Sequence, residues 1–463
     1  MELRRVGDWV WEIPRHGGMR VPGRIWASAR LMDELRDDPA LTQVANVAHL
    51  PGIVGHSLAM PDIHWGYGFP IGGVAAVDAE EGAISPGGIG FDVNCGVRLV
   101  RTGLLAEDVG GVVDRIADAL QQAIPAGVGS EGAIRRLTQR DERRVLERGA
   151  AWAVNEGYGR AADLESTEER GCLAAADPEA VSETARERGR TQLGTLGSGN
   201  HFIEVQRVDE VYDAEAAAPL GVHAGEVVVM IHSGSRGLGY QVCDDAVRTM
   251  GRAAARYGIA MPDRQLACVP LRSPEGRAYF GAMAAAANFA WANRQVMTGL
   301  AEQAFAKVLG TTPLDFGLVY DVCHNIAKIE EHAVDGVRRR VCVHRKGATR
   351  AFPGQPVIIP GDMGRYSFLL LGTERALAET FGTTCHGAGR RMSRSQAKKV
   401  GRGHDLVADL RGRGVTVRAR SLAGVAEEMP WAYKDVADVV DVVDRAGLAR
   451  RVARLRPLAV VKG

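Results

Sequence analysis

The sequence predicts an α+β fold built as one large domain, with mixed β-sheets flanked by helices. Short apolar runs typical of strands are separated by glycine turns, and charged or alanine-rich stretches with helical spacing lie between them. The two kinds of segment do not alternate regularly, as they would in a doubly wound parallel sheet. No internal repeat, linker or break in composition divides the chain. We therefore expect a single domain over residues 1–463.

Strands are expected mainly in two blocks, residues 50–105 and 190–240, where apolar runs end in glycine turns. The stretches that follow these blocks, about 105–190 and 240–310, are rich in alanine, glutamate and arginine and are expected to be helical insertions.

Apolar residues recur at helical spacing over Val247–Tyr257 and Ala278–Val308, so both segments are predicted to be helices. Strand character returns in three short apolar segments: Arg340–Val343, Val357–Ile359 and Phe368–Leu371. After Arg390 the predicted order is helix, strand (Val415–Arg418) and helix, and the chain ends in Leu458–Lys462.

The composition excludes some classes of protein. The formal charge is +1, from 57 Lys+Arg against 56 Asp+Glu, so a site for a polyanion must be a local basic patch. The seven cysteines have no paired spacing, which argues against a disulfide framework and for a reducing compartment. The N-terminal residues lack the apolar core of a signal peptide, and the weakly polar run Ala278–Ala292 is too short to span a membrane. We expect a soluble, cytoplasmic protein with no membrane partner.

The segment Phe91–Arg98 places a carboxylate, Asp92, and a thiol, Cys95, three residues apart, directly after the glycine-rich run Ser85–Gly90. Glycine allows the backbone to bend sharply and approach a ligand closely. A hard oxygen and a soft sulfur together suit a borderline divalent ion such as zinc, manganese or cobalt better than magnesium or calcium. Two residues do not complete a metal site, so further ligands must come from elsewhere in the chain.

The glycine turn Gly194–Gly199 leads directly into Asn200 and His201. Such a loop can hold phosphate with its backbone N–H groups, and the histidine can complete a metal site. The alternative is a plain turn that carries a surface histidine.

Two more histidines follow apolar stretches. His232 ends the strand-like run Val227–Ile231, at a point where a strand passes into a loop and catalytic groups are often held. A core histidine bonded to a backbone carbonyl is the alternative. His324 follows Phe316–Val322, and the next residue, Asn325, could orient it.

Two basic segments suit phosphates. The first, His344–Arg350, contains three cations and a hydroxyl and follows the arginines at 338–340; the alternative is a charged hairpin that faces solvent. The second begins at His386, directly before Gly-Ala-Gly and Arg390, with more cations one turn later. A histidine there could form a covalent intermediate with a phosphoryl group. A tight turn before a basic helix is the alternative.

Taken together, these segments indicate a metal site assembled from distant parts of the chain beside a nucleotide or polyanion site. They also carry a family resemblance. The chain resembles the RtcB family of RNA ligases, most closely its archaeal and animal branch. The matching blocks are Met60–Gly73, Ser85–Arg98, Gly194–Glu204, His232–Gly239, His344–Phe352, His386–Arg390, Met429–Asp435 and the terminal Val460–Gly463.

The resemblance implies a fold with a central dinuclear metal cleft, and it implies roles for individual residues. Two manganese ions would be bound, with the thiolate shared between them, by Asp92, Cys95, His201, His232 and His324. His386 would attack the α-phosphate of GTP and become linked to GMP. The nucleotide would be held by Asn200, Glu204, Ser367, Ala388, Gly389, Tyr433 and Lys462. The RNA path would be lined by Arg236, Arg345, Lys346, Arg350 and Arg390.

One position departs from the family pattern. Asp362 stands in the expected nucleotide pocket where the family usually has serine or threonine. A carboxylate could add an acceptor for the guanine edge, or it could repel a phosphate and change the nucleotide preference.

The activity implied is ligation of RNA 3′-phosphate or 2′,3′-cyclic phosphate ends to 5′-hydroxyl ends, in tRNA splicing or RNA repair. Broken RNA ends, such as tRNA halves, and GTP would be the partners, with an archease-like activating protein as a further one. Two other classes remain open: a dinuclear metallophosphoesterase that hydrolyses RNA ends without joining them, and a non-catalytic RNA-binding paralogue.

Overall fold

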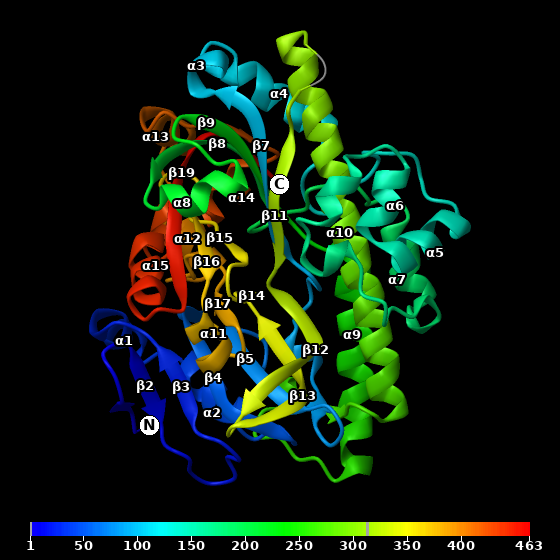
Figure 1. Ribbon diagram of the computed structural model, residues 1–463. Helices are drawn as coiled ribbons and strands as arrows, with labels where there is room; N and C mark the ends of the chain where they lie inside the picture. Colours follow the sequence, from blue (N-terminus) through cyan, green and yellow to red (C-terminus); the bar gives the residue numbers. More distant parts are fainter. Residues whose placement is uncertain (1, 312–313) are drawn as a thin grey trace.

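A computed structural model describes residues 2–311 and 314–463 and confirms the α+β fold class. Two large sheets form the centre, and most helices lie outside them (Figure 1). The long helix α10 runs beside the sheets, with α5, α6 and α9 packed against it and α7 packed against α9. The helices are α1 (Ala29–Leu35), α2 (Ala40–Val47), α3 (Ala106–Val109), α4 (Val113–Ala123), α5 (Gln139–Arg148), α6 (Ala150–Asn155), α7 (Glu183–Gly189), α8 (Ala214–Ala217), α9 (Arg236–Ala253), α10 (Pro274–Leu309), α11 (Glu374–Glu379), α12 (Arg394–Val400), α13 (Leu406–Gly412), α14 (Leu422–Glu427) and α15 (Val436–Arg445).

The seven-stranded sheet contains the N-terminal strands and the β12–β13 hairpin. All neighbouring strands are antiparallel except β3 and β4, which are parallel. In spatial order the strands are β1 (Arg4–Arg5), β2 (Val10–Ile13), β3 (Gly23–Trp26), β4 (Ile53–His64), β5 (Ile71–Asp78), β13 (Val337–Lys346) and β12 (Asn325–Val334).

The eight-stranded sheet carries most of the predicted metal ligands at one of its ends. Its path is β11 (Gly317–Cys323), β7 (Gly96–Leu105), β9 (Glu226–Ser233), β8 (Phe202–Val211), β19 (Ala449–Lys462), β16 (Ser367–Gly372) and β15 (Pro356–Ile359), and β18 (Thr416–Ala419) pairs in parallel with β19. Two small sheets join β6 (Ala83–Ile84) to β10 (Val269–Pro270) and β14 (Ala348–Arg350) to β17 (Thr383–Cys385).

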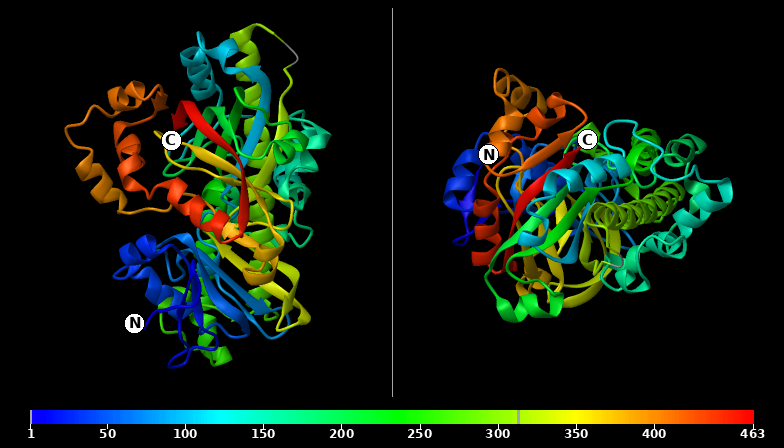
Figure 2. Two further views of the ribbon diagram at one scale, coloured as in Figure 1. Left: turned by 60° about the vertical axis from the view of Figure 1, so that its left-hand side comes forward. Right: turned by 90° about the horizontal axis from the view of Figure 1, so that it is seen from above.

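The eight-stranded sheet is buried on both faces because its strands alternate between two cores. In β9, the side chains of Val227, Val229 and Ile231 join the core that contains α10. Val228 and Met230 point the other way, into a core that includes residues of α13 and α14. This two-residue period is the expected geometry of a strand covered on both sides. The segment that carries α12–α14 extends from the body of the molecule, in orange in Figure 2.

Several predicted elements are correct in type but too short. The helix predicted from Ala278 begins at Pro274, because Ser273 caps it by accepting a hydrogen bond from the N–H of Gly276. The helix predicted at Val247–Tyr257 consists of the C-terminal part of α9 and the 3₁₀ turn that follows it. β13 extends well beyond the predicted Arg340–Val343, because pairing with β12 continues into its exposed arginine-rich end.

A buried ionic cluster fixes one end of the eight-stranded sheet to α10. The carboxylate of Asp321, in β11, accepts hydrogen bonds from Arg98 of β7 at 2.7 Å and from Arg294 of α10 at 2.8 and 2.9 Å. Arg294 also donates to the backbone carbonyls of Asn94 and Ser233, which adjoin or lie in β7 and β9. All three charged side chains have no exposed surface. One guanidinium therefore holds the ends of three neighbouring strands.

Replacing Arg294 with methionine should lower the free energy of unfolding by about 3–5 kcal/mol, because it breaks a buried pair and leaves two carbonyls without donors. Equilibrium urea unfolding measures this change, with the thermal midpoint as a second readout. Arg252→Met, at an exposed arginine of α9, is the matched control and should stay within about 0.5 kcal/mol of the wild type. An equally small effect in Arg294→Met would show that the cluster does not stabilise the fold.

Candidate metal centre and nucleophile

The antiparallel strand order gathers four of the predicted metal ligands at one end of the eight-stranded sheet. His324 directly follows β11, Cys95 directly precedes β7, His232 is near the end of β9, and His201 directly precedes β8. In the order β11-β7-β9-β8, neighbouring chains run in opposite directions, so a strand end meets a strand start at this edge. Residues more than two hundred positions apart thereby become neighbours.

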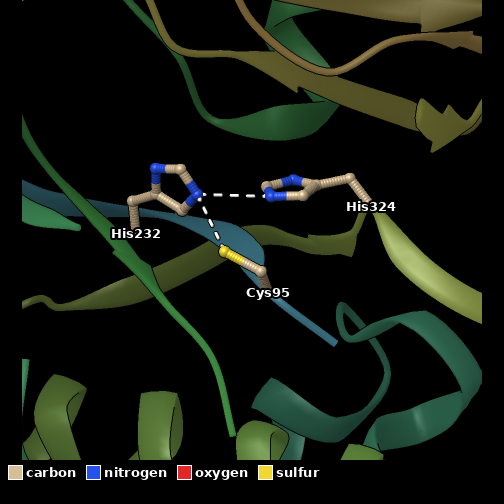
Figure 3. A group of neighbouring side chains, drawn as sticks. All are labelled: Cys95, His232 and His324. Carbon is tan, nitrogen blue, oxygen red and sulfur yellow. Dashed lines mark hydrogen bonds between the residues drawn. The ribbon is translucent and has the colours of Figure 1, made fainter. Parts of the chain in front are cut away.

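The ligand atoms form two groups that share one sulfur. Cys95 Sγ lies 3.2 Å from His232 Nε2, and this nitrogen lies 3.3 Å from His324 Nε2 (Figure 3). On the other side, Cys95 Sγ lies 3.4 Å from His201 Nε2, which is 2.7 Å from an Asp92 carboxylate oxygen. Within each group the atoms are close enough to one another to hold one ion. The geometry fits two metal positions with the thiolate between them.

The surroundings aim the histidines inward and keep His232 and His324 neutral. His201 Nδ1 lies 2.9 Å from the carbonyl of Leu196, a bond that needs its proton on Nδ1 and leaves Nε2 free to bind metal. Burial, followed by the neighbouring imidazoles, lowers the pKa of His232 and of His324 far below the ordinary value. The alternative of a surface histidine at position 201 is wrong, because His201 is buried. The alternative of a core histidine bonded to a backbone carbonyl is wrong for His232, because its Nδ1 has no hydrogen-bond partner among the described residues.

Cys95 requires a cation to become a ligand. Burial and then the charge of Asp92 raise the pKa of this thiol well above its usual range, while the Arg294 guanidinium lowers it. A bound dication would supply the charge that stabilises the thiolate. Gly234 is needed beside this pair, because a Cβ atom there would lie 2.4 Å from the Asp92 carboxylate.

His386 lies next to the cluster but binds a different partner. Its ring centroid is 4.8 Å from that of His324, and its Nδ1 is 2.6 Å from the carboxylate of Asp62, a buried residue of β4. Burial raises the pKa of Asp62, but the adjacent imidazole outweighs this and leaves the pKa below its ordinary value. The ionised carboxylate favours a proton on Nδ1, which in the neutral ring leaves the lone pair on Nε2 free. Gly389, three residues after His386, has a φ of +73°. A Cβ atom at this position would lie 2.3 Å from the carbonyl oxygen of Asp62.

A cleft of about 390 Å³ joins the cluster, His386 and the predicted nucleotide residues. All predicted nucleotide residues except Ser367 line it. Ser367 lies one contact further away: its hydroxyl accepts a hydrogen bond from Gln206, whose amide also donates to Glu204 at 2.6 Å. Burial raises the pKa of Glu204 to about 8. Asp362 also lines the cleft, and its carboxylate is paired with Arg365 at 2.7 Å.

Comparison with known proteins identifies the family of this chain. A family model described as "tRNA-splicing ligase RtcB" matches residues 43–463. The chain belongs to the RtcB family. It is 54% identical to the tRNA-splicing ligase RtcB of Archaeoglobus fulgidus over 478 aligned residues, covering 100% of this chain and 99% of that protein. The Thermococcus kodakarensis tRNA-splicing ligase RtcB is 53% identical with the same coverage, and the RNA-splicing ligase RtcB of Mycobacterium tuberculosis is 54% identical over 91% of this chain and all of its own length.

The cations predicted along the RNA path of this RtcB protein divide into two groups. Lys346 and Arg390 line the cleft, and burial lowers the pKa of Lys346 to about 7. Arg236 and Arg350 do not line it. The first donates to the hydroxyls of Thr195 and Ser130, and the second pairs with Glu169.

The assignment of Arg345 to the RNA path is wrong for this structure. Its side chain is fully buried and forms a two-pronged pair with Glu330, at 2.6 and 2.9 Å. The alternative of a solvent-facing hairpin at His344–Arg350 is also wrong, because the first three residues of that segment are buried.

Sequence reasoning missed two residues on which the site depends, Asp62 and Arg294. Each is a charged residue within an apolar strand or helix, and this pattern was the available signal.

Among the described residues, no helix is long and apolar enough to cross a membrane.

Removing the shared ligand should affect both metal positions at once. Cys95→Ala is expected to weaken divalent metal binding by more than about 100-fold, above the loss typical of outer contacts to a metal site. Equilibrium dialysis against MnCl₂ followed by metal analysis gives the ion-to-protein ratio. Cys243→Ala, at a buried thiol of α9 outside the cluster, is the control. Two ions retained by Cys95→Ala would rule out a bridging thiolate.

Proposed function

We propose that the protein is a GTP-dependent RNA ligase that joins RNA 3′-phosphate or 2′,3′-cyclic phosphate ends to 5′-hydroxyl ends through a histidine–GMP intermediate. The observation that carries this proposal is the position of His386. Its ring is held by Asp62 on one side and lies against the metal-ligating His324 on the other, inside the cleft. A phosphoesterase that only hydrolyses RNA ends would need the metal ligands but not an oriented histidine beside them.

In the first step His386 acts as the nucleophile. Asp62 holds the proton on Nδ1, so the lone pair of Nε2 attacks the α-phosphorus of GTP, and the bond from that phosphorus to pyrophosphate breaks. Two divalent ions, which we infer to be manganese, would be held by the Cys95-centred cluster and would neutralise charge on the phosphates. The backbone at Ala388 and Gly389, with Asn200, lines the cleft where the phosphates would lie.

The remaining steps use the two RNA ends. A cyclic phosphate is first opened by water to a 3′-phosphate. An oxygen of that phosphate then displaces His386 from the GMP phosphorus, which leaves the 3′ end activated by GMP. The 5′-hydroxyl oxygen finally bonds to the 3′-phosphate phosphorus, and GMP and a proton are released. Lys346 and Arg390 are the cations that we assign to RNA phosphates.

Guanine recognition is assigned to the buried end of the cleft. Glu204 can accept hydrogen bonds from guanine N1–H and N2–H, and the ammonium of Lys462 can donate to O6. Tyr433 also lines the cleft, and the Arg390 guanidinium lies 5.0 Å from the centroid of its ring. Because Arg365 partly balances the charge of Asp362, we infer that this carboxylate does not exclude GTP.

His386→Ala should abolish the covalent adduct that forms with Mn²⁺ and α-³²P-labelled GTP, because the proposal assigns the attack to Nε2 of this histidine. The adduct is measured as acid-labile label on the protein after gel electrophoresis. His16→Ala, at an exposed histidine, should label like the wild type. Ligation of a broken tRNA anticodon loop should fail in the same variant.

Three results would contradict the proposal in different ways. Labelling by ATP but not GTP would overturn the guanine assignment and point to Asp362. No label from either nucleotide, together with release of phosphate from RNA ends, would favour a phosphoesterase. Persistent label in His386→Ala would place the nucleophile elsewhere.

The affinity for GTP should rise with pH. The pKa of Glu204 is raised to about 8, so the free protein holds this group protonated at pH 7. The ionised carboxylate is the stronger acceptor for guanine, so the Kd for GTP is expected to fall as the pH rises from 6.5 to about 8. Isothermal titration calorimetry measures this, and Glu204→Gln should bind GTP more weakly without this dependence. An identical pH profile in Glu204→Gln would assign the titration to another group.

A further inference from the structure

Three aromatic rings form a stack that begins in the cleft. The ring of Phe91 packs edge-on against Tyr67, with centroids 5.4 Å apart, and stacks on Tyr240 at 4.9 Å with an interplanar angle of 27°. We call these three residues the aromatic ladder. Tyr67 and Phe91 line the cleft, and Tyr240 continues the stack outward on the first turns of α9.

The outer ring of the ladder is open to solvent. Tyr240 is 50% exposed, and Trp65, in the same loop as Tyr67, is 54% exposed. Isolated exposed apolar side chains are common on protein surfaces, but an exposed ring that extends a stack into a catalytic cleft offers a flat surface for another ring. A nucleobase is such a ring, and its stacking on aromatic side chains does not depend on its sequence.

The ladder and the guanosine residues adjoin different members of the predicted metal cluster. Next to the guanosine residues, the ring of Phe202 packs against His232 and lies 5.7 Å from the ammonium of Lys462. In the ladder, Phe91 directly precedes Asp92. A ligand that contacted both sets of residues would therefore lie beside the cluster, which lines the same cleft as His386.

We propose that the aromatic ladder stacks the terminal base of the RNA strand that carries the 5′-hydroxyl. This inference rests on the proposed ligase function. In-line displacement at the 3′-phosphate puts the attacking 5′-oxygen and the leaving GMP on opposite sides of phosphorus. With GMP on the Glu204 side, the 5′-hydroxyl strand enters from the side of Phe91.

Neighbouring groups fit a nucleotide at this position. Lys346 lines the same part of the cleft and donates hydrogen bonds to the carbonyls of Tyr67 and Phe69 at 2.8 and 3.0 Å. Its ammonium is thereby held beside the ladder, where the phosphate that follows a stacked base would lie. His64 also lines the cleft, and its Nδ1 lies 2.9 Å from the carbonyl of Asp62, which leaves Nε2 as a neutral acceptor. An RNA strand offers a 2′-hydroxyl donor to such an acceptor.

The test uses Tyr240, because it is half exposed and distant in sequence from the metal ligand Asp92, whereas Phe91 adjoins that ligand. Tyr240→Ala removes the outer ring, and Tyr240→Phe keeps the ring without its hydroxyl. Tyr257→Ala is the matched control: this exposed tyrosine lies about 25 Å further along the direction of α9, at roughly 1.5 Å per residue.

In full-length protein, Tyr240→Ala should raise the KM for the 5′-hydroxyl strand between about 5-fold and 100-fold, the range expected when one base–aromatic stack is lost. Tyr240→Phe and Tyr257→Ala should match the wild type. Guanylylation of His386, which needs no RNA, should be unchanged in all three variants. A single-stranded RNA with 2-aminopurine as its 5′-hydroxyl nucleotide provides a second measurement. The wild type and Tyr240→Phe should quench the fluorescence of this base, and Tyr240→Ala should quench it less.

An unchanged KM and unchanged quenching in Tyr240→Ala would overturn the inference. Quenching of 2-aminopurine only when it is the 3′-phosphate nucleotide would also overturn it, because the ladder would then hold the other strand. Failure of the ligase proposal gives a separate result, the absence of any GMP adduct in the wild type. In that case the quenching experiment still decides whether the ladder binds the 5′-hydroxyl nucleotide.

Discussion

The arrangement of the site depends on one buried guanidinium, that of Arg294. Arg294 lies in the middle of α10. Its guanidinium binds the carboxylate of Asp321 and donates hydrogen bonds to the backbone carbonyls of the residues next to Cys95 and His232. Without it, the ends of β7, β9 and β11 would have unpaired polar groups in a site that excludes water. Its positive charge also favours the thiolate form of Cys95. The same interaction therefore supports the fold and favours the ionised form of the thiol that lies between the two predicted metal positions.

The strand order explains how ligands from four segments converge. At either end of an antiparallel sheet, the start of one strand lies beside the end of the next. Residues that precede one strand and residues that follow its neighbour can therefore place their side chains together. His324, Cys95, His232 and His201 follow this rule along β11, β7, β9 and β8. His386 comes from outside this sheet, after β17, and is oriented by Asp62 of the seven-stranded sheet. Metal binding and covalent chemistry are thus assigned to different structural units that meet in one cleft.

Burial gives the cleft its chemical properties. The imidazoles of His232 and His324 are kept neutral, the carboxyl of Glu204 is kept protonated near neutral pH, and the ammonium of Lys346 can lose its proton near pH 7. Each of these shifts comes first from desolvation, which disfavours the charged form of any group. A bound metal ion or nucleotide would add charge beside these groups. Several shifted pKa values within one cleft are typical of a functional site.

The sequence by itself determined the fold class, and it predicted the metal ligands and His386, because these residues lie in glycine turns and at strand ends that are visible as local patterns. Only the tertiary structure decided which atoms face each other, since the pairing of β11, β7, β9 and β8 is set by contacts between distant segments. It also decided that Arg345 is a buried partner of Glu330 and not a surface cation, because a run of basic residues looks the same whether it points inward or outward. Asp62 and Arg294 were not predicted because their partners lie in other elements: His386 is 324 residues from Asp62, and Arg294 contacts Asp321, Ser233 and Asn94 at separations of 27, 61 and 200 residues. Only the packed structure brings these groups into contact.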